Sequence, residues 1–130
     1  MKGTIKLDNP IAVAIDGKQV QLAELKYDTN EITGALFCEA DSKRRFAAGA
    51  KNVSIAPAAE FDCGLHLYLG FAAIIAADSN IDFADLERIH GADLIDVMEV
   101  GRNFIMKSED SAQSNSDDHS ETTAEPTTQA

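Results

Sequence analysis

The chain has 130 residues, and 45% of them are hydrophobic, which is enough for one domain with a core of its own. Its formal net charge is −11, from 22 acidic side chains against 11 lysines and arginines. This charge argues against nucleic-acid binding, because contact with a phosphate backbone needs clustered basic side chains. The basic cluster Lys43, Arg44 and Arg45 lies near the end of a helical pattern, where cations interact favourably with the helix dipole.

The first residues predict antiparallel strands. Residues 4–7 alternate polar and apolar side chains, which favours a short strand, and we expect it to end at the turn signal Asp8-Asn9-Pro10. Residues 11–22 predict a β-hairpin about Asp16-Gly17, since this pair tolerates the positive φ angles of a type I′ turn. Residues 23–27 are expected to form a further short strand.

The register of the hairpin follows from its turn. The cross-strand pairs counted outward from the turn are Val13 with Val20, Ile11 with Leu22, Ala14 with Gln19 and Ala12 with Gln21. The first two pairs share one face of the hairpin and the last two share the other. One face is therefore expected to be apolar and to cover a core.

A first helix is expected after the strands. Either Asn30 or Thr33 can cap it, its apolar positions extend from Ile32 to Phe46 at near-helical spacing, and it ends by Gly49.

The stretch Cys63–Ala77 predicts the central helix. It contains no charged side chain and places apolar groups on every side of a helix, so it must be buried on most faces or lie in lipid. At a rise of about 1.5 Å per residue it is roughly 22 Å long, shorter than the ~30 Å hydrocarbon core of a bilayer. We therefore expect the central helix of a soluble domain, opened by Pro57.

Two more helices complete the predicted fold. Asp82 caps a short helix that Gly91 breaks, and a last helix covers residues 92–106, where apolar side chains at three- and four-residue spacings make one stripe. The acid pairs Asp82 with Asp85 and Asp93 with Asp96 are interpreted as helix-start electrostatics. The predicted fold class is α+β, an N-terminal antiparallel hairpin or small sheet followed by a bundle of about four helices.

The composition changes after Lys107. Residues 108–130 contain five serines, four threonines and six acidic residues, but no valine, isoleucine, leucine or aromatic residue. Nothing in this segment can be buried to offset the entropy of ordering it. The sequence therefore predicts a single domain over residues 1–107 and a disordered acidic tail over residues 108–130, which either keeps the protein soluble or becomes ordered on a partner.

Few residues suggest metal or catalytic chemistry. Cys63 and His66 share a face of the central helix and Cys38 could approach from the first helix, but they lack metal-ligand spacing and lie in apolar runs. A cysteine nucleophile beside His66 would lack an acid to orient the histidine. No phosphate loop or dinucleotide fingerprint occurs. We expect no enzyme activity and no metal or other cofactor, and reduced thiols in a cytoplasmic protein without a secretory signal.

Several short motifs occur in an order that resembles a known family. The N-terminal motifs are Asn9-Pro10-Ile11, Ile15-Asp16-Gly17-Lys18, Glu24-Leu25-Lys26-Tyr27-Asp28 and Glu31-Ile32-Thr33-Gly34. The C-terminal motifs are Asp85-Leu86-Glu87-Arg88-Ile89-His90-Gly91-Ala92-Asp93 and Val100-Gly101-Arg102-Asn103-Phe104, the second followed by a tail of serine, glutamate and aspartate. Over residues 4–112 the chain resembles the tail assembly chaperones of tailed phages and Mu-like prophages.

The resemblance implies a non-enzymatic assembly factor in the cytoplasm of the bacterial host, absent from the mature virion. Proteins of this family are thought to bind the long, hydrophobic tape measure protein, keep it soluble and bring tail tube subunits to it. In many of these phages a translational frameshift makes a second, extended product.

A chaperone of this kind needs an apolar surface for a helical client, and helix-in-groove binding by the central or last helix would provide it. The expected client contacts are Leu65, Leu69, Phe71, Ile75, Val97, Arg102, Asn103 and Phe104. For Arg102 and Asn103, helix capping is an equally good explanation. One side of the central helix is expected to remain open for a partner or a second copy of the chain, at Leu65, Leu69, Gly70 and Ala73.

Three other functions are left open. The first is a small structural protein of the tail or neck, which would be recovered in purified virions. The second is an enzyme or metal-dependent regulator that uses Cys38, Cys63 and His66. The third is a prophage-encoded inhibitor that binds a host protein through an acidic face, although the acidic residues are spread along the chain. Neither a membrane nor a nucleic acid is an expected partner.

Overall fold

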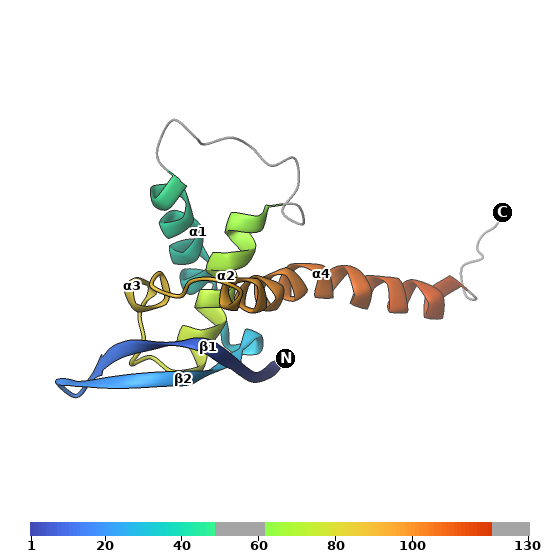
Figure 1. Cartoon of the computed structure of the whole chain (residues 1–130). Coiled ribbons are helices and arrows are strands. Elements are labelled where there is room, and N and C mark those ends of the chain that lie inside the picture. The colour runs from blue at the N-terminus through green and yellow to red at the C-terminus, as the bar shows by residue number, and fades with distance from the viewer. Residues whose placement is uncertain (49–61, 121–130) are drawn as a thin grey trace.

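The computed structural model describes the backbone of residues 1–48 and 62–120, and the side chains of residues 1–47 and 62–106. In chain order the elements are β1 (Lys2–Ile15), β2 (Lys18–Asp28), the 3-10 helix η1 (Thr29–Glu31), α1 (Gly34–Ala48), α2 (Cys63–Ala77), α3 (Phe83–Leu86) and α4 (Asp93–Ser120). The two strands form an antiparallel sheet, with the helices grouped on one side of it (Figure 1). The predicted α+β fold, an N-terminal antiparallel sheet followed by about four helices, is confirmed.

The hairpin has the predicted turn and register. Asp16 and Gly17 have φ angles of +53° and +76°, the left-handed values that a type I′ turn requires. All four predicted cross-strand pairs are present. Val13 is fully buried, whereas Val20, on the opposite strand, is 36% exposed. The apolar face therefore packs on the helices along β1 and opens to solvent on β2 near the turn.

The turn predicted at Asp8-Asn9-Pro10 is wrong, because β1 continues through these residues with a shift in register. Between the pairs Lys6–Glu24 and Ile11–Leu22, four residues of β1 lie opposite one residue of β2, so the strand bulges here and does not end. The carboxylate of Asp93 holds the bulge, since its two oxygens accept hydrogen bonds of 2.9 Å each from the backbone N–H groups of Asp8 and Asn9. Residues 23–27, predicted as a separate strand, belong to the second half of β2.

Side chains cap α1 and α3 at their N-termini. Thr33 caps α1, where its hydroxyl accepts a hydrogen bond of 3.1 Å from the N–H of Leu36, whereas the other predicted cap, Asn30, lies within η1. Asp82 caps α3 as predicted, and it forms a reciprocal capping box with Asp85.

Asp62, which no sequence pattern singled out, caps the start of α2. Its carboxylate accepts a hydrogen bond of 2.9 Å from the N–H of Leu65. Arg44 forms salt bridges with Asp62, at 3.2 Å, and with Asp41, at 2.8 Å. Arg44 thus links the end of α1 to the start of α2 through ion pairs, in addition to the predicted interaction with the helix dipole. The predicted opening of this helix at Pro57 lies outside the described residues.

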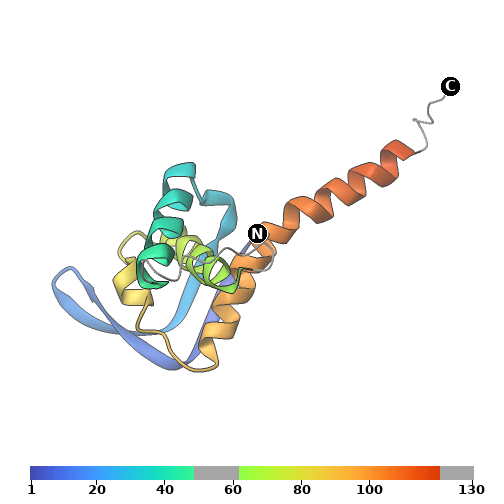
Figure 2. The same cartoon turned by 90° about the horizontal axis from the view of Figure 1, so that it is seen from above.

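α2 has the predicted bounds and lies at the centre of the molecule, where it packs against α4, α1 and β2. Its contact with α4 is close because a glycine of each helix faces the backbone of the other. A Cβ atom on Gly101 would lie 1.8 Å from the carbonyl oxygen of His66, and one on Gly70 would lie 2.2 Å from the carbonyl oxygen of Val97. The side of α2 that was expected to remain open near Gly70 is therefore covered by α4, as the crossing of the two helices in Figure 2 shows.

The last helix is longer than predicted. The apolar stripe predicts an end at Met106, but α4 continues to Ser120, and its final part projects away from the other elements (Figures 1 and 2). The stripe shows only where a helix is buried, whereas the backbone hydrogen bonds of a helix can continue beyond its packed part. Residues 121–130 lie outside the described residues, and the division between a domain and a tail at residue 107 stays a prediction.

Candidate interaction surface

Four of the eight predicted client contacts lie in the core. Their side chains are at most 7% exposed, and they are Leu65, Leu69, Phe71 and Val97. In the folded domain these side chains offer little surface to a partner, although Phe71 reaches the lining of the apolar groove described below, and their role as client contacts stays a prediction. The sequence did not indicate this burial for the residues of α2, because a helix that is apolar all round does not show which of its sides a neighbouring element covers.

The other four contacts lie nearer the surface but do not come together. The two helices cross where Gly70 and Gly101 meet, and Ile75 on α2 and Phe104 on α4 lie beyond this crossing on different helices. Phe104 is half-buried, with its ring centroid 6.4 Å from that of Phe37 on α1. Arg102 and Asn103 are exposed on α4. The roles predicted for these four residues stay predictions.

An open groove with mainly apolar walls lies between the end of α1, α2, the segment that follows α3 and the start of α4. Its volume is about 510 Å³. The lining residues are Phe46, Ala47, Leu67, Tyr68, Phe71, Glu87, Ile89 and Leu94. This apolar groove brings together residues from four segments of the chain, which no local sequence pattern could have joined.

Phe46 is the most exposed large apolar side chain of the groove, with 88% of its surface accessible. Its near-helical spacing from Ile32 predicted it as part of the apolar stripe of α1. Ala40 belongs to that stripe and is fully buried, but Phe46 follows it by six residues, which is about 240° around a helix at 3.6 residues per turn. The spacing therefore contained the signal that Phe46 lies off the buried face.

Tyr68 gives the groove its polar contact. Its hydroxyl donates a hydrogen bond of 2.8 Å to the carboxylate of Glu87, and its ring packs edge-on against Phe71 with centroids 4.9 Å apart. Burial, and then the hydrogen bond to Glu87, raise the pKa of Tyr68 to about 12. The phenol is therefore neutral at physiological pH, and its only proton is engaged by Glu87.

Comparisons of the chain with protein-family models, curated proteins and solved structures found no match. The family resemblance of the motifs stays a prediction. The apolar groove offers contact area and one hydrogen-bonded Tyr68–Glu87 pair, which suits it to binding an apolar side chain that carries or adjoins a polar group.

The residues considered for metal chemistry are not clustered. Cys38 and Cys63 are exposed thiols, whereas His66 is 2% exposed at the contact between α2 and α4. Within the part of the chain whose side chains are described, no group of three histidine, cysteine or acidic residues could hold a metal ion. None of the described helices is both long enough and apolar enough to cross a bilayer.

Proposed function

We propose that this protein is a non-enzymatic phage tail assembly chaperone that binds the tape measure protein in the cytoplasm of the bacterial host, keeps it soluble and helps to recruit tail tube subunits. The observation that carries the proposal is the open apolar groove with Phe46 at its rim. Contiguous exposed apolar surface usually marks a site where another molecule binds. The order of the sequence motifs supports the choice of this family.

The client contact we propose is helix-in-groove binding. The apolar stripe of a client helix would contact Phe46, Leu67 and Leu94, which are exposed or half-buried in the free protein. Burial of one large apolar side chain contributes about 1.5–3 kcal/mol. A few such contacts give a reversible complex once the costs of association are subtracted, and a chaperone that is displaced by tube subunits needs reversible binding and no nucleotide.

The charge of the chain supports the same function. A net charge of −11 opposes self-association through repulsion, and an excess of one charge keeps a coated hydrophobic client in solution. Among the residues that line the groove only Glu87 is charged, and its carboxylate accepts the hydrogen bond of Tyr68. The chain can therefore bind apolar side chains while its remaining surface stays hydrated.

Co-expression tests the proposal. The protein would be produced together with a phage tape measure protein, and the soluble fraction of this client would be measured with and without it. We expect soluble client, and co-purification, only when this protein is present. A client that is equally soluble alone would contradict the proposal.

Matched variants test the groove. Phe46→Ser removes the exposed ring at the rim and is expected to lower the yield of soluble client at least several-fold. Ile95→Ser is the control, because Ile95 is also a largely exposed apolar residue, at 62%, but does not line the groove. Equal losses for both variants would show that general surface hydrophobicity, and not the groove, binds the client.

Purified virions distinguish a chaperone from a structural tail or neck protein. An assembly factor is expected in infected-cell lysate but not in purified particles, as measured by quantitative mass spectrometry. Recovery at a fixed number of copies per particle would favour the structural protein.

A further inference from the structure

β1 has a free edge, and the register identifies its hydrogen-bonding groups. The N–H of Thr29 donates a hydrogen bond of 2.8 Å to the carbonyl of Met1, and residues 2–6 pair with residues 24–28. Hydrogen-bonded and non-hydrogen-bonded pairs alternate along an antiparallel ladder. The residues whose backbone N–H and C=O groups are directed away from β2 are therefore Lys2, Thr4 and Lys6.

Farther along β1, side chains from other elements form hydrogen bonds with the backbone groups of the same edge. The N–H groups of Asp8 and Asn9 donate to the carboxylate of Asp93 on α4, and the guanidinium of Arg88 donates to the carbonyl of Ala12. Over residues 2–6, no hydrogen bond from another described element reaches this edge. Proteins usually protect exposed strand edges, so a stretch that is left open next to protected ones is a place where a further strand can pair.

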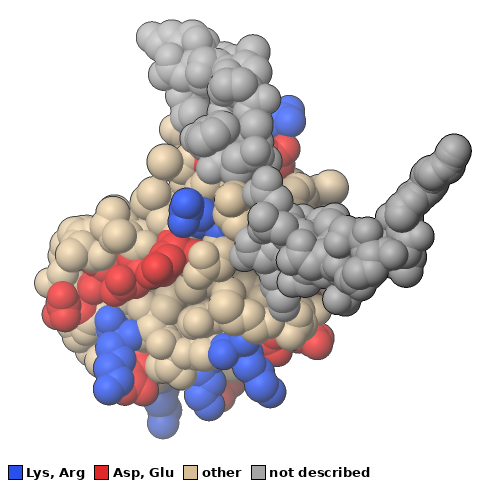
Figure 3. Space-filling view, turned by 90° about the vertical axis from the view of Figure 1, so that its right-hand side faces the viewer, with Lys and Arg blue, Asp and Glu red and all other residues tan. Residues whose placement is uncertain are grey.

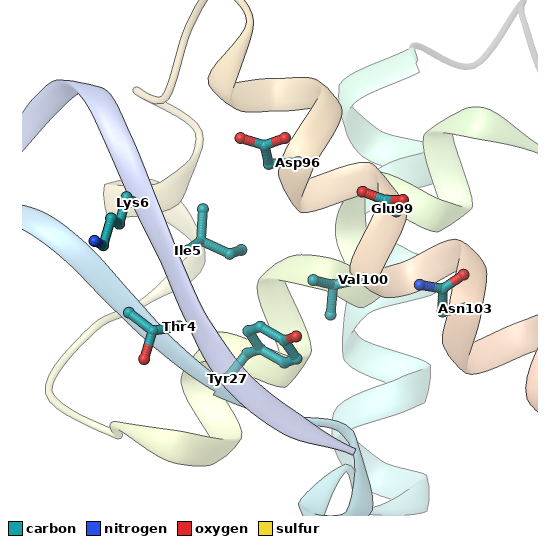
Figure 4. Close-up of a pocket in the computed structure, with 8 residues that line it drawn as sticks. All are labelled: Thr4, Ile5, Lys6, Tyr27, Asp96, Glu99, Val100 and Asn103. Carbon is teal, nitrogen blue, oxygen red and sulfur yellow. The ribbon is translucent and has the colours of Figure 1, made fainter.

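The open stretch borders a polar slot beside α4. The slot has a volume of about 300 Å³ and is lined by Thr4, Ile5, Lys6, Tyr27, Asp96, Glu99, Val100 and Asn103. Figure 4 shows Ile5 and Tyr27 pointing from the sheet towards α4, with the carboxylates of Asp96 and Glu99 on the opposite wall. Ile5 and Val100 are buried and form an apolar floor.

The carboxylates of the polar slot have room for a cation. Among the described residues, neither Asp96 nor Glu99 takes part in a salt bridge. Lys6 lies on the other wall, but its side chain points away from α4 (Figure 4). Figure 3 shows, on one face of the molecule, a row of acidic side chains, with basic side chains and further acidic ones below it.

We propose that the polar slot binds an extended peptide segment that carries lysine or arginine, and that this segment pairs with the free edge of β1 as a third strand. The edge supplies main-chain hydrogen bonds, as in β-strand addition. Side chains alternate across a strand, so every second residue of the segment points into the slot towards Asp96 and Glu99, where a basic group is favoured. This binding is separate from the apolar groove and does not depend on the function proposed for it.

A second copy of the chain fits this edge poorly. Two copies that paired through β1 about Thr4 would place Lys2 of one copy opposite Lys6 of the other, at both ends of the contact. Like charges directly opposite each other on paired strands are destabilising. The slot therefore favours a different chain, with basic residues that face α4.

Peptide binding tests the proposal on the full chain. The probe is a synthetic peptide of about ten residues that alternates arginine and threonine, a length that covers a typical strand. Its control has glutamate in place of arginine. We expect binding of the arginine peptide, seen by titration calorimetry, and NMR shifts of the Thr4 and Lys6 amides. No binding of the arginine peptide, or equal binding of the glutamate peptide, would overturn the proposal.

Two proline variants test whether the peptide binds at the edge of β1 or at the edge of β2. Thr4→Pro removes an N–H that faces the slot, and Lys26→Pro removes the equivalent N–H on the outer edge of β2, since Thr4 and Lys26 are cross-strand partners. We expect Thr4→Pro to weaken binding about tenfold or more, and Lys26→Pro to leave it nearly unchanged. The reverse result would place the peptide on β2 and contradict the proposal.

Charge and peptide variants supply readouts that do not depend on a proline in the protein. The double variant Asp96→Asn with Glu99→Gln is expected to weaken binding about tenfold. N-methylation of alternate peptide amides blocks one edge of the peptide at a time, and only one of the two methylated sets should abolish binding. Equal binding of both sets, or no effect of the double variant, would show that the peptide does not bind as a strand in the polar slot.

Discussion

Asp93 is a buried carboxylate that joins α4 to the bulge of β1. It is 1% exposed, and its two oxygens accept the hydrogen bonds from Asp8 and Asn9. These hydrogen bonds, that from Asp8 above all, lower the pKa of Asp93, although burial acts in the opposite direction. A buried charge is tolerated only with such partners, and the two backbone N–H groups at the bulge need an acceptor because they do not pair with β2.

The variant Asp93→Asn tests this role. The amide can accept at one position only, so one N–H group loses its acceptor, and we expect a loss of about 1–3 kcal/mol in the free energy of unfolding at neutral pH. The folded pKa lies below the unfolded value of 3.8. The contribution of the charge is therefore complete above that value and is lost as the pH falls through the folded pKa.

Urea unfolding of both proteins over a series of pH values measures the effect. The difference between wild type and variant should be constant near neutral pH and should shrink on acidification below the unfolded pKa of Asp93. A difference that does not change with pH would mean that the carboxylate acts through its shape and not through its charge.

At the scale of secondary structure, the crossing of α2 and α4 depends on two glycines. Because glycine has no side chain, the backbones of the two helices come into close contact at these positions. A Cβ atom on Gly101 would lie 1.8 Å from the carbonyl oxygen of His66. Backbone atoms cannot move aside as a flexible side chain can. The close crossing buries the apolar side of α2 that faces α4, including Leu69 and Ala73.

Gly101→Ala is expected to force α2 and α4 apart and to lower the free energy of unfolding by about 2 kcal/mol or more. Gly34→Ala is the matched control, because nothing lies within 4 Å of a Cβ atom at the start of α1. Alanine is the better helix former, so this variant should be unchanged or slightly more stable, by up to about 1 kcal/mol. Thermal unfolding of both variants checks the pair, and a stable Gly101→Ala protein would contradict the close crossing.

Local patterns predicted the elements of this fold better than their contacts. The turn at Asp16-Gly17 determines the hairpin register, and the uncharged stretch Cys63–Ala77 determines α2, because both depend on residues that are neighbours in sequence. The hydrogen bond from Asp8 to Asp93 spans 85 positions. No local pattern contains that contact, so the sequence indicated a turn where β1 in fact continues.

The candidate site was harder to predict for the same reason. Apolar composition marked Leu69 and Phe71 as contact residues, but burial of these residues depends on where α4 and α3 pack. Phe46 had a detectable signal in its spacing, whereas the apolar groove beside it depends on four segments that only the folded chain brings together. The polar slot likewise needs β1 and α4 side by side.

At the scale of the whole molecule, the body of the domain is held by α2, and the last part of α4 is set apart from it. α2 packs against both helices beside it and against β2, whereas the final part of α4 projects away from these elements (Figure 2). A helix without tertiary packing is marginal in water even when its sequence favours helix, and residues 108–120 are rich in serine and aspartate, which are weak helix formers. The stability of the domain should therefore come from residues before this segment.

Deletion of residues 108–130 tests where the folded domain ends. The deletion removes six acidic residues and no lysine or arginine, which changes the net charge from −11 to −5. Because the removed segment supplies no valine, isoleucine, leucine or aromatic side chain for burial, we expect Tm to change by no more than about 2 °C, less than the 4–8 °C that 1 kcal/mol produces in a domain of this size. Solubility at high concentration should fall, since repulsion between copies weakens. Calorimetry of the full and shortened chains in the same buffer measures the change in Tm. A clear drop in Tm would mean that this segment packs on the domain.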